Sequence, residues 1–410
     1  MKAILVVGDG MADRPVKELG GRTPLEAAET PNMDAVAREG VCGIMDILAP
    51  GRPPGSDVAN LTLLGYDPWK SYRGRGALEA LGAGLEVGQG DVALRGNFAY
   101  VDDDEVVVDR RAGRVDGSAF ADHLSAVRLD AYPDVEVLVR PTLGHRLAVI
   151  LRGRGLSWKV SDIDPHRVGA RILRSTPLNG TAEARRTAAV ANELYQVLRE
   201  MMRDHPVNRE RIEKGLPPAN AVILRGAGEP PAITPLTDLY GVRGACVAVT
   251  PTVRGACLSA GFDVHEAPGA TGGVDTDAVA KAEVAERVLP GYDIVYVHVK
   301  GADNASHDGD PELKIGVIEK IDAMVGHLLE HIDLSETYVA VTADHTTSLR
   351  EREHTGDPVP VAILGPEVRS DRVTSYSERA CARGGLCRIR GKDLMPILLN
   401  LQGKMKLYGS

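Results

Sequence analysis

The stretch Thr337-Tyr338-Val339-Ala340-Val341-Thr342-Ala343-Asp344-His345 determines the fold class of this chain. A short run of β-branched, aromatic and small residues leads directly into an acidic residue and a histidine. Such a run is typical of a strand that is buried on both faces of a parallel sheet. Two further runs share this design, because residues 3–7 lead to Asp9 and residues 292–299 lead to Asp303. We therefore expect an α/β domain with a mostly parallel sheet, whose polar residues gather where such sheets bind ligands, at the carboxyl ends of the strands.

The middle of the chain has a different pattern from its two ends. Helical periodicity lies between the apolar runs, over 276–289 and 311–332. The middle instead combines strands around an acidic turn within 92–114, further short strands, and a long amphipathic helix over 183–205. Such a block between pieces of a parallel sheet indicates an inserted α+β domain. The expected domains are 1–90 with 266–410 for the catalytic part and 91–265 for the insertion.

Composition and charge restrict the classes of function. The 410 residues are 43% hydrophobic, which is enough to bury a core and excludes a mainly disordered chain. The net charge of −9 argues against a nucleic-acid partner, because phosphate backbones attract basic surfaces. No stretch reaches the roughly 18 apolar residues of a membrane span, and the first apolar run is too short for a signal peptide. Five scattered cysteines suggest no disulfide framework. We expect a cytoplasmic protein that binds neither nucleic acid nor membrane, and the sequence does not indicate its oligomeric state.

Four segments offer carboxylates and imidazoles as metal ligands. They hold Asp9, Asp303 with His307, Asp344 with His345, and His354. Asp303 and His307 are four residues apart, so one helical turn would place both on one face. Asp344 and His345 are adjacent and diverge, so the pair can serve two neighbouring ions or an ion and a substrate. These donors suit Mn²⁺, Zn²⁺, Co²⁺ or Mg²⁺, and two ions about 3.5–4 Å apart are a known clamp for phosphoryl transfer.

Ser56 has two interpretations. It follows Pro53-Pro54-Gly55, which breaks regular structure, and it precedes Asp57 and an apolar helical pattern. A serine in this position is most often a plain helix cap, and the segment taken alone favours that interpretation. The same position also offers backbone N–H groups and the positive end of a helix dipole to a phosphate, next to a hydroxyl that a nearby metal would activate.

Taken together, these motifs resemble a known family, the archaeal-type 2,3-bisphosphoglycerate-independent phosphoglycerate mutases of the alkaline phosphatase superfamily. The matching stretches span nearly the whole chain and include Gly8-Asp9-Gly10-Met11, Gly55-Ser56-Asp57, Arg73-Gly74-Arg75-Gly76, Asp164-Pro165-His166, residues 298–310 and His354-Thr355-Gly356-Asp357-Pro358. The resemblance implies a three-layer catalytic domain interrupted by a lid domain. It also implies two divalent ions, with Mn²⁺ or Mg²⁺ ranked before Zn²⁺ or Co²⁺, and no 2,3-bisphosphoglycerate.

The resemblance also implies a reaction and roles for the ligand set. The implied reaction interconverts 3-phosphoglycerate and 2-phosphoglycerate in glycolysis and gluconeogenesis. It makes Ser56 the nucleophile, which carries the phosphoryl group while glycerate reorients. One ion would be held by Asp9, Ser56, Asp344 and His345, and the other by Asp303, His307 and His354. Such a transfer needs water to be excluded, which gives the inserted domain a function as a closing lid.

Further residues are candidates for binding the substrate. They are Arg146, Asp162, Asp164, His166, Asn220 and Arg225 in the insertion, and Lys300 beside the Asp303 segment. In a strand, Asp162 and Asp164 would face the same side, whereas the alternative is an acidic turn before Pro165. Lys281 is a second candidate, besides Lys300, for the lysine that contacts the phosphate.

Two other functions fit parts of this pattern. A metal-dependent phosphomonoesterase or a phosphopentomutase-like enzyme would use the same ligand set. A metabolite-binding protein without catalytic activity could keep the fold, although pure binding would not need the Ser56 nucleophile.

Overall fold

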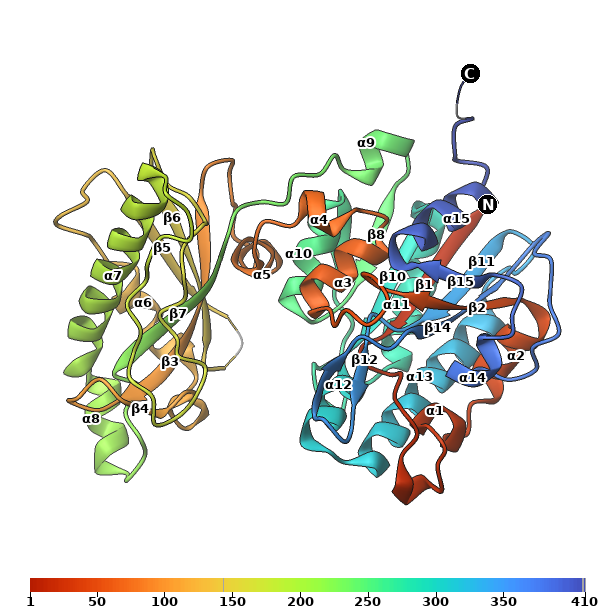
Figure 1. The fold of residues 1–410 in the computed structure, drawn as a ribbon, viewed down its shortest axis with the longest axis horizontal. Coiled ribbons are helices and arrows are strands. Elements are labelled where there is room, and N and C mark those ends of the chain that lie inside the picture. The colour runs from red at the N-terminus through yellow and green to blue at the C-terminus, as the bar shows by residue number, and fades with distance from the viewer. Residues whose placement is uncertain (143, 408, 410) are drawn as a thin grey trace. The chain divides into compact units, whose positions relative to one another are not determined.

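The computed structural model describes residues 1–142, 144–407 and 409 (Figure 1). The chain forms two compact units. The first unit combines Met1–Tyr72 with Ile233–Ser410, and the second unit is the continuous segment Arg73–Ala232. The second unit is therefore inserted into the sequence of the first.

The first unit is built on a mixed sheet with the order β15-β2-β14-β11-β1-β10-β8-β9. Its strands are β1 (Lys2–Gly8), β2 (Val41–Asp46), β8 (Gly244–Val247), β9 (Phe262–His265), β10 (Ile294–Val299), β11 (Thr337–Thr342), β14 (Val359–Leu364) and β15 (Cys387–Arg390). All of these strands except β14 run in the same direction, because β14 is antiparallel to both of its neighbours. The α/β class and the mostly parallel sheet expected from the apolar runs are confirmed.

Helices cover the sheet of the first unit on both faces. Every residue of β10, β11 and β14 is buried, which requires that both faces of these strands are covered. One set of helices packs together around α13, namely α1 (Pro24–Ala27), α2 (Pro31–Glu39), α11 (Val279–Val288), α12 (Gly301–Asp308) and α13 (Pro311–His331). A second pair consists of α3 (Ser56–Leu63) and α10 (Pro251–Ser259). The remaining helices of this unit are α4 (Pro68–Ser71), α9 (Leu236–Tyr240), α14 (Glu378–Cys381) and α15 (Leu394–Leu401).

The register of the central strands brings their carboxyl ends level. Val7 lies beside His298 of β10 on one side and beside Thr342 of β11 on the other. The residues that follow these three strands therefore emerge at the same edge of the sheet. A small hairpin of β12 (Thr346–Ser348) and β13 (Glu353–Thr355) continues from β11 at this edge.

The second unit is an antiparallel sheet with helices. Its strands follow the order β4-β3-β6-β5, and β7 also pairs with β3. They are β3 (Val92–Val101), β4 (Val107–Asp109), β5 (Glu136–Pro141), β6 (Arg146–Arg152) and β7 (Ala221–Gly228). Its helices are α5 (Arg75–Gly82), α6 (Ala121–Leu124), α7 (Ala182–Arg203) and α8 (Pro206–Glu213).

The two faces of this antiparallel sheet bury different groups. Val92 and Leu94 of β3 belong to the large core that includes the apolar side of α7. Ala93, between them, joins a smaller core with Ala77 and Ala80 of α5. Side chains alternate along a strand, so the β3 residues that follow Ala93 at two-residue spacing also face the α5 side.

The limits of the inserted unit differ from the expected 91–265. Helix α5 packs on β3, β6 and β7, so the insertion already begins at Arg73. At the other end, β8 pairs in parallel with β10, which places it in the main sheet and ends the insertion at Ala232. Short strands do not reveal from sequence which sheet they join, so the expected limit of 265 wrongly includes β8 in the insertion. Among the described residues, no helix is both long and apolar enough to cross a membrane.

Candidate active site

The predicted metal ligands converge at the carboxyl edge of the first unit's sheet. Asp9, Asp303 and Asp344 are all almost completely buried there. Asp9, His298 and Asp344 form one group whose potential ligand atoms all lie within 4.8 Å of one another, and Asp303, His345 and His354 form a second. A third such group, His307, Glu353 and His354, overlaps the second. The polar side chains that follow the strands therefore lie close together, as their positions in the sequence predict.

Ser56 lies at this cluster and does not cap its helix. Gly55 is the N-cap of α3 and Ser56 is the first helical residue. The Ser56 hydroxyl is instead 3.1 Å from Nε2 of His345. The capping interpretation is therefore wrong, because the helix begins one residue earlier than that interpretation requires.

Asp9, Asp344 and His345 lie around the serine. Asp9 Oδ1 is 3.2 Å from His345 Nε2. Asp344 is oriented by two donors, since Oδ1 accepts a hydrogen bond from the Gly10 amide at 3.2 Å and Oδ2 accepts one from the Asn60 side chain at 3.0 Å. Asn60 also donates to the Ser56 carbonyl, so the first turn of α3 and Asp344 are held together.

Asp303 gathers the second group. Helix α12 places His307 one turn after Asp303, as the spacing predicts, with His307 Nε2 at 3.3 Å from Asp303 Oδ1. His354 of β13 approaches the same oxygen to 3.2 Å with its own Nε2. Thr347 donates to Asp303 Oδ1 at 2.8 Å. His345 stacks on His354, with ring centroids 3.7 Å apart, and also lies 3.2 Å from Asp9, so the two groups are contiguous.

Hydrogen bonds fix the tautomers of the histidines. Nδ1 of His307 donates to the Arg352 carbonyl at 2.7 Å, and Nδ1 of His354 donates to the Pro54 carbonyl at 2.8 Å. The proton of Thr347 is given to Asp303, so Nδ1 of His345, 3.0 Å away, donates to that hydroxyl oxygen. A neutral ring that donates through Nδ1 presents a lone pair at Nε2, which is the form that binds a metal ion.

The charges of the cluster also call for cations. Lys300 is the lysine that contacts these carboxylates, at 3.1 Å from Asp9 Oδ2 and 2.6 Å from Asp303 Oδ2. Burial raises the pKa of Asp303, but the Lys300 ammonium together with the His307 and His354 side chains outweighs burial and holds that pKa well below its usual range. Burial by itself lowers the pKa of Lys300. The Asp9 and Asp303 carboxylates together raise it by more, so the pKa of Lys300 lies above its usual value. One ammonium cannot neutralise three buried carboxylates, and Asp9 Oδ1 accepts no hydrogen bond among the described residues. The donor set and its charge therefore fit divalent ions.

Lys281, the alternative lysine, lies beneath the site. Its ammonium is buried and donates to the His298 carbonyl at 2.8 Å. Burial lowers the pKa of Lys281 to about 8. Of the two candidate lysines, Lys300 is the one that contacts the clustered carboxylates.

A separate polar cluster lies in the second unit, around Asp164. This buried carboxylate is forked by Arg110, with Nη2 at 2.6 Å from Oδ2, and Arg225 lies 3.4 Å from the same oxygen. His166 contacts Asp162 at 2.9 Å through Nε2, and its amide donates to Asp164 at 2.8 Å. The chain forms neither a strand nor an assigned turn at residues 161–165, and both Asp162 and Asp164 contact His166.

More arginines extend this cluster along the α5 face of the sheet. Arg95 lies opposite Arg225 in the register of β3 and β7, and Arg146 lies opposite Asn97. Burial, opposed by Glu79 and reinforced by neighbouring arginines, lowers the pKa of Arg95 to about 9. Burial also lowers the pKa of Arg146. Crowded, buried guanidinium groups with few carboxylate partners form a site suited to an anion.

Asn220 does not belong to this cluster. Its side chain accepts a hydrogen bond from the Val101 amide at 2.9 Å and donates to the Val101 carbonyl at 2.8 Å. Both of its polar groups are thereby used to join β3 to the start of β7. The candidate role of Asn220 in substrate binding has no support from these contacts.

Several residues of the two clusters were missed from sequence. His298 and Arg95 lie inside buried strands, where periodicity predicts core residues, and Thr347 follows the candidate ligands Asp344 and His345 without a motif of its own. Asn60 carries a signal that could have been used, because it lies one helical turn after Ser56. Arg110 donates to both carboxylate oxygens of Asp164.

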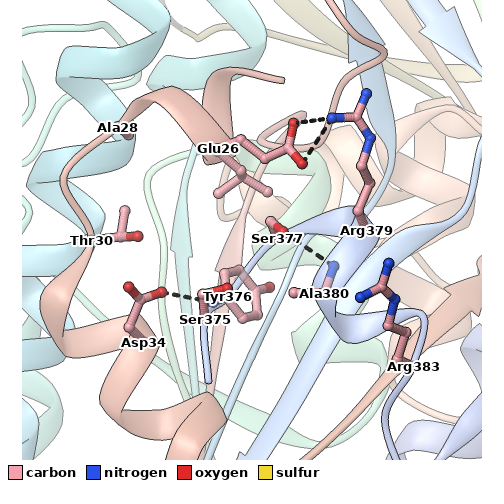
Figure 2. Close-up of a pocket in the computed structure, with 11 residues that line it drawn as sticks. Glu26, Ala28, Thr30, Asp34, Ser375, Tyr376, Ser377, Arg379, Ala380 and Arg383 are labelled. Carbon is pink, nitrogen blue, oxygen red and sulfur yellow. Dashed lines mark hydrogen bonds and ion pairs between the residues drawn. The ribbon is translucent and has the colours of Figure 1, made fainter. Parts of the chain in front are cut away.

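A surface hollow of the first unit lies apart from these residues. It is lined by α1, α2 and α14, and Figure 2 shows how its polar side chains pair. Glu26 holds Arg379 with both oxygens, and Asp34 accepts a hydrogen bond from the Tyr376 amide. None of the candidate ligands lines this hollow.

Comparisons with known proteins agree with this geometry. The sequence model of the Metalloenzyme superfamily matches residues 1–401. The first unit's fold and its buried carboxylate–imidazole cluster thus define a metal-dependent enzyme.

Relatives at higher identity narrow the class. A 2,3-bisphosphoglycerate-independent phosphoglycerate mutase of Ignicoccus hospitalis is 50% identical, over 100% of this chain and 99% of its own. One from Methanothermobacter thermautotrophicus is 47% identical over all of both chains. A solved structure of the cofactor-independent phosphoglycerate mutase of Thermoplasma acidophilum is 36% identical, with a TM-score of 0.69 over 98% of this chain and 100% of the other. A solved protein of Pyrococcus horikoshii, also 36% identical, has a TM-score of 0.86 over 100% and 99%. This chain belongs to the 2,3-bisphosphoglycerate-independent phosphoglycerate mutase family.

Proposed function

We propose that this chain interconverts 3-phosphoglycerate and 2-phosphoglycerate through a phosphoserine at Ser56. The observation that carries the proposal is the position of the Ser56 hydroxyl, 3.1 Å from His345 Nε2 and beside the buried carboxylates. A serine at the start of a helix, next to a metal-binding cluster, is arranged as a nucleophile toward phosphorus. We place the reaction in the cytoplasm, in glycolysis and gluconeogenesis, as expected of this small-molecule substrate.

Two divalent ions complete the proposed site. Asp9, Ser56, Asp344 and His345 would hold one, and Asp303, His307 and His354 would hold the other. When bound, the ions lower the pKa of the Ser56 hydroxyl and neutralise charge on the phosphoryl oxygens. Carboxylate and imidazole donors suit Mn²⁺ or Mg²⁺, and the same set accepts Zn²⁺ or Co²⁺.

The protein groups then account for the transfer. Ser56 Oγ loses its proton and forms a bond to phosphorus while the bond from phosphorus to the C3 oxygen of glycerate breaks, and that C3 oxygen takes up a proton. In the second half, the C2 hydroxyl loses its proton and forms a bond to the same phosphorus, while the bond from phosphorus to Ser56 Oγ breaks and Ser56 Oγ regains a proton. Asn60 and the Gly10 amide keep Asp344 oriented throughout, and the Lys300 ammonium is placed to contact phosphoryl oxygens.

We assign recognition of the glycerate part to the second unit. The glycerate carboxylate is an anion, and Arg146 and Arg225 supply partly buried guanidinium groups for it. Asp162, Asp164 and His166 offer acceptors and a donor for the hydroxyl groups. The expectation that this unit also excludes water as a lid remains part of the proposal.

A phosphate balance tests the proposed reaction. The metal-loaded protein is given 3-phosphoglycerate, and both 2-phosphoglycerate and free phosphate are measured over time. We expect 2-phosphoglycerate to form without 2,3-bisphosphoglycerate and with little phosphate release. If free phosphate were the main product, the chain would be a phosphomonoesterase and the proposal would be refuted.

A further inference from the structure

His298 is a buried imidazole that the proposed ligand set does not use. It lies in β10, and its side chain is 1% exposed. Its Nε2 is 3.2 Å from Asp9 Oδ2 and 3.9 Å from Asp344 Oδ2. Together with those two carboxylates it forms a group whose potential ligand atoms all lie within 4.8 Å of one another.

The direction of the His298 ring shows that it is not simply bonded to Asp9. Nε2 is near enough to Asp9 for a hydrogen bond, yet it has no hydrogen-bond partner among the described residues. A hydrogen bond needs the N–H to point at the acceptor, and here the short distance is not accompanied by that alignment. Asp9 Oδ1 behaves in the same way toward His345, at 3.2 Å and without a hydrogen bond.

Such spacing is expected of atoms that share an ion. Two ligand atoms that each lie about 2.1 Å from a common ion are about 3.0–3.4 Å apart when the angle at the ion is between octahedral and tetrahedral. The expected ligand pairs of this site follow that rule, since Asp303 Oδ1 is 3.3 Å from His307 and 3.2 Å from His354. The His298–Asp9 pair has the same separation as these pairs.

The backbone of His298 is also held firmly. Its strand β10 pairs on one side with β1, where His298 lies beside Val7, and on the other side with β8. Lys281 adds a hydrogen bond to the His298 carbonyl at 2.8 Å. A ligand needs such support, because metal affinity depends on how well the ligand is positioned before the ion arrives.

We propose that His298 is a ligand, through Nε2, of the ion held by Asp9 and Asp344. This inference rests on the proposed two-ion site and deepens it, because it gives that ion an additional protein ligand besides Ser56. Imidazole nitrogen favours Mn²⁺, Co²⁺ or Zn²⁺ over Mg²⁺, so His298 also biases the metal preference of the site.

The full-length His298→Gln variant tests this role. Gln keeps a polar side chain of similar size in the buried strand, and His327→Gln is the matched control, because His327 pairs with Glu286 on the helices α13 and α11. Each protein is stripped of metal and titrated with Mn²⁺ and Co²⁺, and the fold is checked by circular dichroism. We expect two ions in the wild type and in His327→Gln, and at least about 10-fold weaker binding of one ion in His298→Gln.

The bonded nitrogens are counted by pulsed electron paramagnetic resonance on the Mn²⁺-loaded proteins. We expect one fewer directly bonded histidine nitrogen in His298→Gln than in the wild type. An unchanged affinity would overturn the proposal. So would a weaker affinity with an unchanged nitrogen count, since His298 would then only orient Asp9.

If His298→Gln does not fold, the count of bonded histidine nitrogens in the wild type still tests the proposal. Four histidine nitrogens bonded to the two ions support the proposal, and three contradict it. Failure of the mutase reaction itself would show as absent 2-phosphoglycerate in the wild type, which leaves the nitrogen count unaffected. The two proposals therefore fail in distinguishable ways.

Discussion

The two units of this chain build their polar sites by opposite means. In the first unit, parallel strands end level with one another, so residues far apart in the sequence meet at one edge of the sheet. In the second unit, antiparallel register places Arg95 opposite Arg225 on one face of the sheet. The first site has an excess of buried carboxylates and the second an excess of buried guanidinium groups. This contrast agrees with the proposal that cations complete the first site and that an anionic substrate binds at the second.

Removal of metal should have the largest effect on this contrast. Treatment with a chelator should abolish mutase activity, because three buried carboxylates then lack their counter-charges, and Mn²⁺ should restore it. Activity is measured by 2-phosphoglycerate formation, and metal content by elemental analysis. Full activity in metal-free protein would remove the two-ion account of the first unit.

Loss of the Ser56 hydroxyl should have the second largest effect. Ser56→Ala should lower turnover by at least about 10³-fold, because the variant lacks the hydroxyl that is proposed to carry the phosphoryl group. Mass spectrometry of wild-type protein quenched with substrate should locate phosphate on Ser56. Ser259→Ala, whose hydroxyl bonds the Gly255 carbonyl on α10, is the matched control and should stay fully active. Retained turnover in Ser56→Ala would refute the mechanism.

His354→Ala should affect one ion and leave the fold in place. His354 contacts Asp303 at 3.2 Å and is only partly buried. Its removal should therefore weaken metal binding more than it lowers the stability of the fold. We expect the metal content to fall from two ions to one at limiting Mn²⁺, and turnover to fall with it. His331→Ala, at the exposed end of α13, should keep both ions. If His354→Ala still bound two ions, His354 would not be a metal ligand.

Arg225→Gln should give the smallest effect, and it should act on substrate binding by the second unit. A hydrogen bond between charged groups contributes about 1.5–3 kcal/mol, so the KM for 3-phosphoglycerate should rise about 10- to 100-fold. Arg110 still pairs with Asp164, so the fold should persist, and metal content should not change. Arg186→Gln, which breaks an exposed pair with Asp134, should leave KM unchanged. If Arg225→Gln instead altered metal binding and spared KM, the division of roles between the units would fail.

Sequence predicted the first site better than the second. Asp9, Asp303 and Asp344 each follow an apolar run, and strand polarity alone brings such residues together. The i, i+4 spacing likewise predicted that His307 would reach Asp303. By contrast, the neighbours of Arg95 depend on strand register, and register is set by pairing partners that the sequence does not display. His298 was missed for a related reason, since a histidine inside an apolar strand has the pattern of a core residue.

The limits of the insertion also depend on contacts between segments that are distant in the sequence. The expected boundary near residue 90 follows the change in strand pattern, whereas α5 already packs on the inserted sheet. The expected boundary near 265 overlooked β8, whose partner β10 lies far along the chain. Local patterns identify an element, but the unit that it joins is decided by contacts distant in sequence.

The pairing of β1 has a consequence for the synthesis of this chain. β1 is made first, yet its partners β10 and β11 are made after the whole inserted unit. The inserted unit is continuous, so it can complete its core while β1 still lacks both neighbours. Closing contacts between such distant segments is slow. An apolar strand thus remains open to wrong partners for most of translation, and we expect refolding from denaturant to show a fast phase for the second unit and a slower phase for the first.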